Sequence, residues 1–301
     1  MGNLITHKPG RGPKIMIAAH MDEIGFIVKH IDERGFMRLQ PLGFWDPRAM
    51  VAQRVHIHGR ETLLGALQTT HRPAHTQPLE ERSKAAKLED FYVDVGLTAE
   101  QVRALVQIGD MATMARSTEQ VGNCVISKAL DDRVSIFVMI EALRACQGSD
   151  ADIFAVATTQ EEVGCRGATT AAYALQPAVG IALDVTLAHD IPGAPDQDRV
   201  TQLGQGAAIK IMDSNSISHP GLVQRFRDVA TQHRITHQME ILDLGGTDAG
   251  PIQRSQTGVP TLTLSIPTRY IHTPNEMADM RDIEACISLL ARYLENAEQP
   301  L

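Results

Sequence analysis

Five histidine and carboxylate residues, far apart in the chain, have the chemistry to bind divalent metal ions together. Each lies at the end of an apolar or tightly turned stretch, and they are His20, Asp131, Glu162, Asp184 and His272. Imidazole nitrogens and carboxylate oxygens form a mixed ligand set that suits Zn²⁺, Co²⁺ or Mn²⁺ better than copper or an iron–sulfur cluster. We therefore expect two divalent metal ions per subunit, Zn²⁺ or Co²⁺ before Mn²⁺, in the ligand set of a two-metal hydrolase.

Asp22 follows His20 by two residues, at the end of an apolar run. On an extended chain, side chains two residues apart share a side, so this carboxylate can lie beside the imidazole and fix its tautomer. Taken alone, the pair is better interpreted as a strand-end histidine with a solvated aspartate. The other acidic clusters reverse that preference.

Asp131 and Asp132 precede the strongly apolar segment 134–140. Taken alone, one of them is best interpreted as the N-cap of a helix, because carboxylates accept hydrogen bonds from the free N–H groups of a first turn. Within a metal centre, however, the two oxygens of one carboxylate can bridge two cations. Asp131 is our candidate for that bridging position.

Glu161 and Glu162 are consecutive carboxylates between an apolar stretch and Gly164. Such a pair is often only part of a solvated loop. Placing two like charges close together at the end of a sheet is costly unless cations or a shared proton compensate, which favours a metal site. Neighbouring side chains point in different directions, so one glutamate can bind metal while the other acts on the water.

Continuous apolar runs precede four of the ligand segments and predict strands that are buried on both faces. These runs are 14–19, 153–159, 179–183 and 261–266. Helical patterns lie between them, strongly over 283–294 and more weakly over 222–230. Alternating strands and helices predict an α/β fold with a largely parallel sheet, and sites in such sheets form beyond the carboxyl ends of the strands.

The glycine-dense turn 245–250 leaves two interpretations open. It has no following Lys-Ser or Lys-Thr, which argues against a phosphate-binding loop. It can equally line the site or simply connect two elements.

Residues 26–117 show a different pattern, with short alternating runs between glycines and prolines. This pattern predicts a small β-rich domain, within which 69–89 is an exposed loop. We therefore expect a catalytic domain made of 1–25 and 118–301, with 26–117 inserted into it.

The composition describes a globular chain and argues against several classes of protein. Among 301 residues, 43% are hydrophobic and 21% charged, and the net charge is −8 without a cluster of Lys and Arg, which argues against a nucleic-acid partner. No apolar run reaches the roughly 20 residues of a membrane span, and no signal-peptide pattern opens the chain. The cysteines lack metal-site or disulfide spacing, and they are Cys124, Cys146, Cys165 and Cys286. We expect a soluble, cytoplasmic protein without a membrane partner.

The acidic clusters, together with further segments, resemble the cytosolic metallo-aminopeptidases of the TET group. That group includes glutamyl aminopeptidases and proteins called endoglucanase M, and forms metallopeptidase family forty-two. The resemblance covers nearly the whole chain in order, and its segments are 2–5, 19–26, 45–48, 129–133, 160–164, 182–186, 245–250 and 266–274.

The resemblance implies a zinc-peptidase-like α/β/α sandwich with a mixed sheet, carrying a PDZ-like insert that helps to assemble the oligomer. The substrates would be peptides with a free N-terminus, and the assembly would be a tetrahedral homo-dodecamer. One metal ion would be held by His20, Asp131 and Asp184, and the other by Asp131, Glu162 and His272.

The resemblance also implies the two remaining roles in the site. Asp22 would support His20, and Glu161 would be the general base. The expected reaction is hydrolysis of an N-terminal peptide bond by a water shared between the two ions, whose pKa falls toward neutrality. Glu161 would take its proton and return it to the leaving amine.

Two other kinds of protein remain open from the sequence. A two-metal deacylase or carboxypeptidase could use a similar ligand set. A truncated, inactive metal-binding or assembly protein is the second alternative, because relatives carry helix and strand before the segment that matches 2–5. A cellulase is less favoured, because the adjacent Glu161 and Glu162 are poorly arranged to flank a glycosidic bond.

Overall fold

The computed structural model describes residues 1–78 and 85–297. The chain forms two compact units. The larger unit contains residues 1–22, 118–271 and the chain from 275 onward, and the smaller unit contains 23–117 and 272–274. Within the described part, no helix combines the length and apolar character needed to cross a bilayer.

The larger unit contains a mixed sheet, which in the described residues has ten strands. The order is β1-β11-β2-β12-β15-β16-β10-β9, with β13 beside β15 and β14 beside β13. The neighbours β11, β2, β12 and β15 run parallel, whereas β1 pairs antiparallel with β11, and β16 and β13 pair antiparallel with β15. The strands are β1 (Leu4–Lys8), β2 (Lys14–His20), β9 (Glu119–Val121), β10 (Cys124–Ser127), β11 (Asp152–Thr158), β12 (Val179–Leu187), β13 (Ala207–Met212), β14 (His237–Ile241), β15 (Thr261–Arg269) and β16 (Glu276–Asp279).

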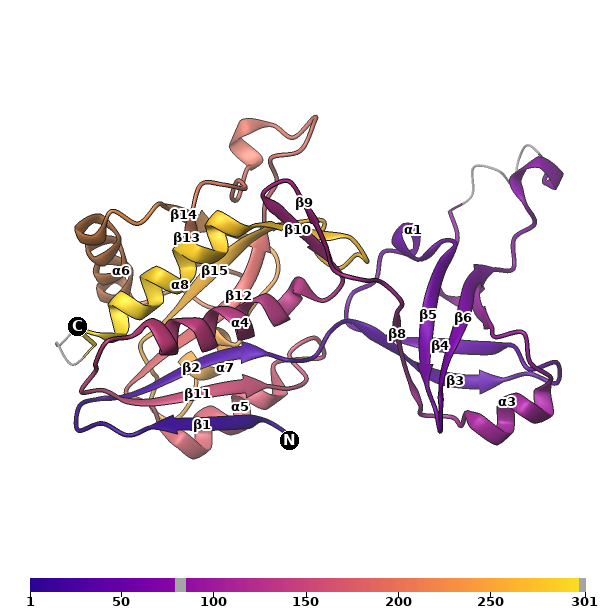
Figure 1. The fold of residues 1–301 in the computed structure, drawn as a ribbon, viewed down its shortest axis with the longest axis horizontal. Coiled ribbons are helices and arrows are strands. Elements are labelled where there is room, and N and C mark those ends of the chain that lie inside the picture. The colour runs from indigo at the N-terminus through magenta and orange to yellow at the C-terminus, as the bar shows by residue number, and fades with distance from the viewer. Residues whose placement is uncertain (79–84, 298–301) are drawn as a thin grey trace. The chain divides into compact units, whose positions relative to one another are not determined.

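Helices cover both faces of this sheet (Figure 1). One face is covered by α4, α6 and α8, whose buried side chains form one cluster with the strands. The other face is covered by α5 and α7. The bounds are α4 (Leu130–Ala145), α5 (Arg166–Leu175), α6 (Pro220–His233), α7 (Ala249–Gln253) and α8 (Met280–Leu294), with a 3₁₀ turn η3 (Asp196–Asp198).

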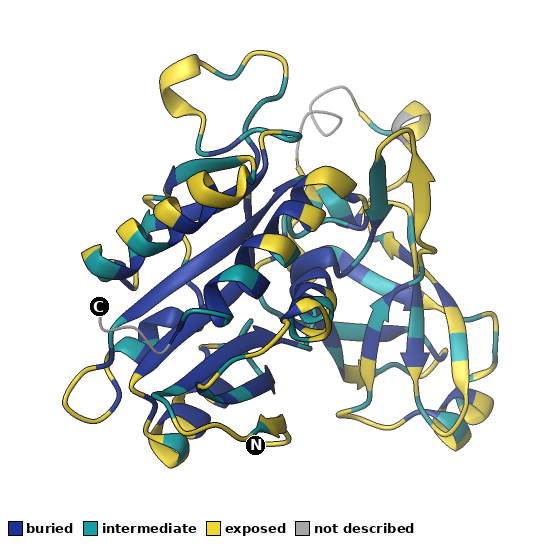
Figure 2. Cartoon of the chain, turned by 60° about the vertical axis from the view of Figure 1, so that its left-hand side comes forward, coloured by how far each residue is buried: buried dark blue, intermediate teal, exposed yellow. Residues whose placement is uncertain are grey.

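The central strands are apolar on both faces because both faces are covered. In β2, Ile15 and Ile17 pack on the side of α4 and α8. Met16 and Ala18 alternate with them and pack on the side of α5 and α7. Figure 2 shows the middle of the sheet as buried along its length. The four predicted buried strands are therefore confirmed, and the fold is a mixed α/β fold as expected.

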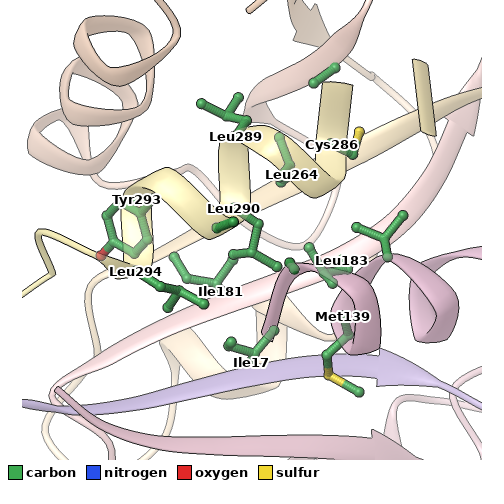
Figure 3. Close-up of a cluster of buried hydrophobic side chains, with 14 of the residues drawn as sticks. Ile17, Met139, Ile181, Leu183, Leu264, Cys286, Leu289, Leu290, Tyr293 and Leu294 are labelled. Atoms are coloured by element: carbon green, nitrogen blue, oxygen red, sulfur yellow. The ribbon is translucent and has the colours of Figure 1, made fainter. Parts of the chain in front are cut away.

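The main core of the larger unit lies where α4, α6 and α8 pack on the sheet. The apolar stripe predicted over 283–294 forms α8, and Asp279 caps its start by accepting from the Arg281 N–H. Figure 3 shows Leu290 of α8 among Ile181 and Leu264 of the sheet. All three side chains are fully buried.

The smaller unit is β-rich, as the sequence predicts, and its strands close into a barrel in the order β3-β4-β7-β6-β5-β8. Phe26 and Trp45 stack in its core at 4.7 Å between ring centroids. Part of the loop predicted at 69–89 is exposed, while 79–84 lie outside the described residues. The elements are β3 (Gly25–Ile31), β4 (Met37–Leu42), α1 (Pro47–Met50), β5 (Gln53–His58), β6 (Thr62–Thr69), η1 (Ala74–Thr76), η2 (Leu88–Asp90), β7 (Phe91–Asp94), α3 (Ala99–Leu105) and β8 (Met111–Met114).

Replacing Leu290 by alanine is expected to lower the free energy of unfolding by about 2–5 kcal/mol, because it leaves a cavity where α8 meets the sheet. Urea denaturation followed by circular dichroism measures this loss. The matched control is Leu244→Ala, at a side chain that is 76% exposed. Equal losses in the two variants would contradict the placement of this core.

Candidate metal centre

Polar side chains lie level with one another where three parallel strands end. Thr158 at the end of β11 is opposite His20 at the end of β2. Ala182 of β12 is opposite Ala18, so Asp184, two residues further, reaches the level of His20. These are carboxyl ends of parallel strands, where sites of α/β sheets form. The pairing of these apolar strands thus places His20 and Asp184 at the same level along the sheet.

A buried group of one histidine and three aspartates gathers at this edge of the sheet. His20, Asp131, Asp132 and Asp184 each offer one ligand atom, and these atoms lie within 4.8 Å of one another. His20 Nε2 is 3.0 Å from Asp131 Oδ1. The donor set, with one imidazole nitrogen and several carboxylate oxygens, fits a divalent cation of the zinc or cobalt kind.

Asp131 and Asp132 enter this group because the chain turns before it becomes regular helix. Both lie in the first turn of α4 with non-helical backbone angles, and the peptide bond between them is cis. The residue at the N-cap position is Ala129, and no side chain caps the helix. Neither aspartate therefore occupies the N-cap position of α4. The Asp131 N–H donates to Glu276 Oε2 at 3.0 Å, which ties this turn to β16.

The imidazole of His20 is oriented by Asp22, mainly through the main chain. His20 Nδ1 lies 3.1 Å from the Asp22 carbonyl oxygen and 3.6 Å from its carboxylate. A hydrogen bond from Nδ1–H to the carbonyl leaves Nε2 as the nitrogen that can bind a metal. The Asp22 carboxylate instead accepts from the N–H groups of Glu161 and Glu162, at 3.2 Å each. Asp22 therefore also holds the turn that carries both glutamates.

Burial and neighbouring charges strongly shift the pKa values of the side chains in this buried group. Burial opposes a charged His20, but hydrogen bonds to Asp131 and Asp22 prevail and raise its pKa well above the ordinary value. Burial, together with neighbouring aspartates, raises the pKa of Asp132 and of Asp184 well above the ordinary range. Asp132 Oδ1 is buried and has no hydrogen-bond partner among the described residues. A cation relieves such crowding, because it stabilises the ionised carboxylates.

Glu161 lies beside this group and faces two neighbours. Its Oε2 is 4.0 Å from His20 Nε2, and its Oε1 accepts a hydrogen bond from Cys165 Sγ at 3.1 Å. Burial raises the pKa of Glu161 to about 7, and the nearby charge of Asp248 adds to the rise. A carboxyl group with a pKa near neutrality can accept and return a proton at working pH.

Glu162 and His272 are not members of the buried group around His20. Glu162 lies in the turn between β11 and α5, next to Glu161. His272 follows β15 with a φ of 62° and begins the segment 272–274 of the smaller unit. The participation of these two residues in a metal centre stays a prediction.

Asp248 and Cys165 were missed by reasoning from the sequence. Asp248 belongs to the glycine-dense turn 245–250, and its Oδ2 accepts from the Thr158 hydroxyl at 2.5 Å. With Glu161 and Cys165 it forms a further group whose ligand atoms lie within 4.8 Å of one another. The turn therefore lines the site, which was one of its two open interpretations. A buried partner far away in the chain leaves no trace in the local sequence.

A histidine and several carboxylates at the carboxyl ends of parallel strands define a candidate metal-dependent hydrolase of mixed α/β fold. The chain belongs to the M42 glutamyl aminopeptidase family, whose model matches residues 2–289. Members of this family are metal-dependent aminopeptidases, hydrolases that cleave peptide bonds. The resemblance to the TET group is thereby confirmed.

Individual relatives agree with this assignment. The chain is 36% identical over 306 residues to the lysyl aminopeptidase of Pyrococcus furiosus, across 98% of this chain and 85% of that protein. An aminopeptidase structure from the archaeon Desulfurococcus kamchatkensis matches with a TM-score of 0.93 and 38% identity, across 98% of this chain and 83% of that chain. The TET1 peptidase of Pyrococcus horikoshii, which can assemble into a tetrahedron or a large octahedral shell, matches with a TM-score of 0.85 and 27% identity, across 97% and 87%.

Thr158→Val is expected to destabilise the protein, and more so at alkaline pH. Burial raises the pKa of Asp248 from 3.8 to about 6, while the Thr158 hydroxyl limits the rise by donating to the ionised carboxylate. The contribution of this carboxyl to the free energy of unfolding therefore falls as the pH rises from 3.8 to about 6. Without the Thr158 hydroxyl the pKa of Asp248 rises further, so in the variant the free energy of unfolding continues to fall at higher pH.

The expected loss in the valine variant is about 1–3 kcal/mol at pH 8 and smaller at pH 5, where the carboxyl is protonated in either folded protein. Urea unfolding of metal-depleted protein at both pH values measures it. Thr158→Ser keeps the hydroxyl and is the matched control. A loss of the same size at both pH values would refute this coupling.

Proposed function

We propose that this aminopeptidase removes N-terminal amino acids from peptides with a free N-terminus, using two divalent metal ions and Glu161 as general base. The observation that carries the proposal is the buried ligand group around His20, with Glu161 Oε2 4.0 Å from His20 Nε2. A base at that distance from a metal ligand can reach a water held at the same centre.

For the first ion we propose His20, Asp131 and Asp184, which lie in the buried group. For the second we propose Asp131, Glu162 and His272, a candidate set of two carboxylates and one imidazole. Asp131 would then be the bridging carboxylate. Zn²⁺ or Co²⁺ suits these donors best, with Mn²⁺ as the alternative.

When bound, the two ions would lower the pKa of the attacking water and polarise the scissile carbonyl. The residues of this chain would transfer the proton and orient the groups of the site. Glu161 takes the proton of the water on its carboxylate and returns it to the leaving amine. His20 is kept in the Nε2-accepting tautomer by Asp22, whose carboxylate also fixes the backbone of Glu161 at 3.2 Å. A neighbouring carboxylate would hold the free α-amine of the peptide.

We also propose that the chain works as a homo-oligomer in the cytoplasm, in the form of a tetrahedral dodecamer. Support comes from the TET1 peptidase of similar structure, which can assemble into a tetrahedron or an octahedral shell. The β-rich unit would be the PDZ-like insert that contributes to assembly, and the larger unit the zinc-peptidase-like sandwich.

Glu161→Gln is expected to lower kcat by about 10²–10⁴-fold, because the amide cannot accept the proton, while metal content stays near that of the unchanged protein. Turnover of an aminoacyl chromogenic substrate and metal analysis by mass spectrometry measure the two effects. Glu284→Gln, at an exposed position of α8, is the matched control. Loss of metal together with activity would assign Glu161 a ligand role instead.

Metal-depleted protein is expected to regain activity when Zn²⁺, Co²⁺ or Mn²⁺ is resupplied, and only on peptides with a free amine. Release of free amino acids from a peptide and from its N-acetylated form measures this. Hydrolysis of the acetylated form would favour the two-metal deacylase or carboxypeptidase. Absence of hydrolysis with every ion would favour the inactive metal-binding protein.

A further inference from the structure

A second cluster of ligand-type side chains lies beside the proposed catalytic group and is not used by it. Glu161, Cys165 and Asp248 each offer one ligand atom, and these atoms lie within 4.8 Å of one another. We propose that these three residues form an additional, inhibitory site for a thiophilic divalent cation such as Zn²⁺ or Cd²⁺. A thiolate sulfur with two carboxylates is a donor set that such borderline and soft cations prefer.

The geometry of Glu161 joins this site to the catalytic one. Oε2 faces His20, whereas Oε1 accepts the hydrogen bond of the Cys165 thiol at 3.1 Å. A cation can replace the thiol proton in that position. The S–H bond breaks, the proton passes to solvent and a sulfur–metal bond forms. Cys165 is the N-cap residue of α5. Burial and the nearby charges of Glu161 and Asp248 raise the pKa of its thiol far above the usual range, so the thiolate forms when a bound cation replaces the proton.

Asp248 supplies an independent observation that favours a ligand there. Its side chain is buried, with only 2% of the residue exposed. Oδ2 accepts from the Thr158 hydroxyl, but Oδ1 has no hydrogen-bond partner among the described residues. Burying a carboxylate oxygen without a partner is costly, and coordination of a cation removes that cost.

Occupancy of this site would hold the carboxylate of Glu161 in a metal–oxygen bond. The carboxylate then cannot take a proton from the attacking water, so excess cation would inhibit the enzyme reversibly. The inhibitory effect rests on the proposed role of Glu161 as general base. The binding of the cation does not.

The first test titrates the metal-loaded enzyme with Cd²⁺ and records the ultraviolet charge-transfer band of cadmium–thiolate bonds. None of the ligands proposed for the catalytic ions carries sulfur, so this band reports cadmium bound to a cysteine, and the variants show which cysteine binds it. The band is expected in the unchanged protein and in the control Cys124→Ala, and it is expected to be lost in Cys165→Ala. A band that persists in Cys165→Ala, or none in the unchanged protein, would overturn the site.

The second test measures inhibition by Zn²⁺ in each variant, relative to that variant's own activity without added ion. Removing the thiolate is expected to raise the half-inhibiting concentration about tenfold or more, because sulfur dominates the affinity for such ions. Asp248→Asn, which keeps an acceptor for the Thr158 hydroxyl and loses the charge, should weaken the Cd²⁺ band and the inhibition together. Unchanged inhibition in both variants would refute the inhibitory role, whereas an inactive enzyme that still shows the band would refute only the proposed function.

Discussion

Repulsion between carboxylates that share one buried space is the constraint on which the site depends. Asp131, Asp132 and Asp184 each direct an oxygen into the small volume around His20, and burial makes each ionised form costly. Backbone donors compensate part of this charge, since the His20 N–H donates to Asp132 and the Val185 N–H to Asp184. One imidazole cannot balance three carboxylates, so the arrangement favours divalent cations.

A second set of buried charges in the same unit shows the contrast. Lys210 is fully buried, with its Nζ 2.9 Å from Glu240 Oε1 and 3.7 Å from Asp213 Oδ2. The Thr186 hydroxyl also donates to Glu240 at 2.5 Å. There a side-chain cation lies among the carboxylates, as is usual for charges inside proteins. Around His20 the acidic excess is larger, and side chains alone do not offset it.

The strands could be predicted from the sequence because helices cover both faces of β2, β11, β12 and β15, which leaves continuous apolar runs in the chain. The positions of His20 and Asp184 at the ends of these runs follow from the same pattern. The partners of Asp132 and Asp248 could not be predicted. Local sequence does not tell whether a carboxylate caps a helix or enters a buried centre, and Asp248 meets Thr158 from 90 residues away. Closure of the β-rich unit into a barrel likewise depends on pairing between distant strands.

Because β2 is apolar on both faces, polarity alone does not set its alignment with its neighbours. A strand with one wet face resists a slip of one residue, since the slip turns its apolar side chains toward water. In β2 a slip of one residue would exchange the apolar face that packs on α4 and α8 for the apolar face that packs on α5 and α7. Ile17 would then lie where Ala18 fits. The slip would also drive the imidazole of His20 away from Asp131 and into hydrocarbon. His20 of the candidate metal centre therefore helps the folding chain to select a single alignment of its central strand.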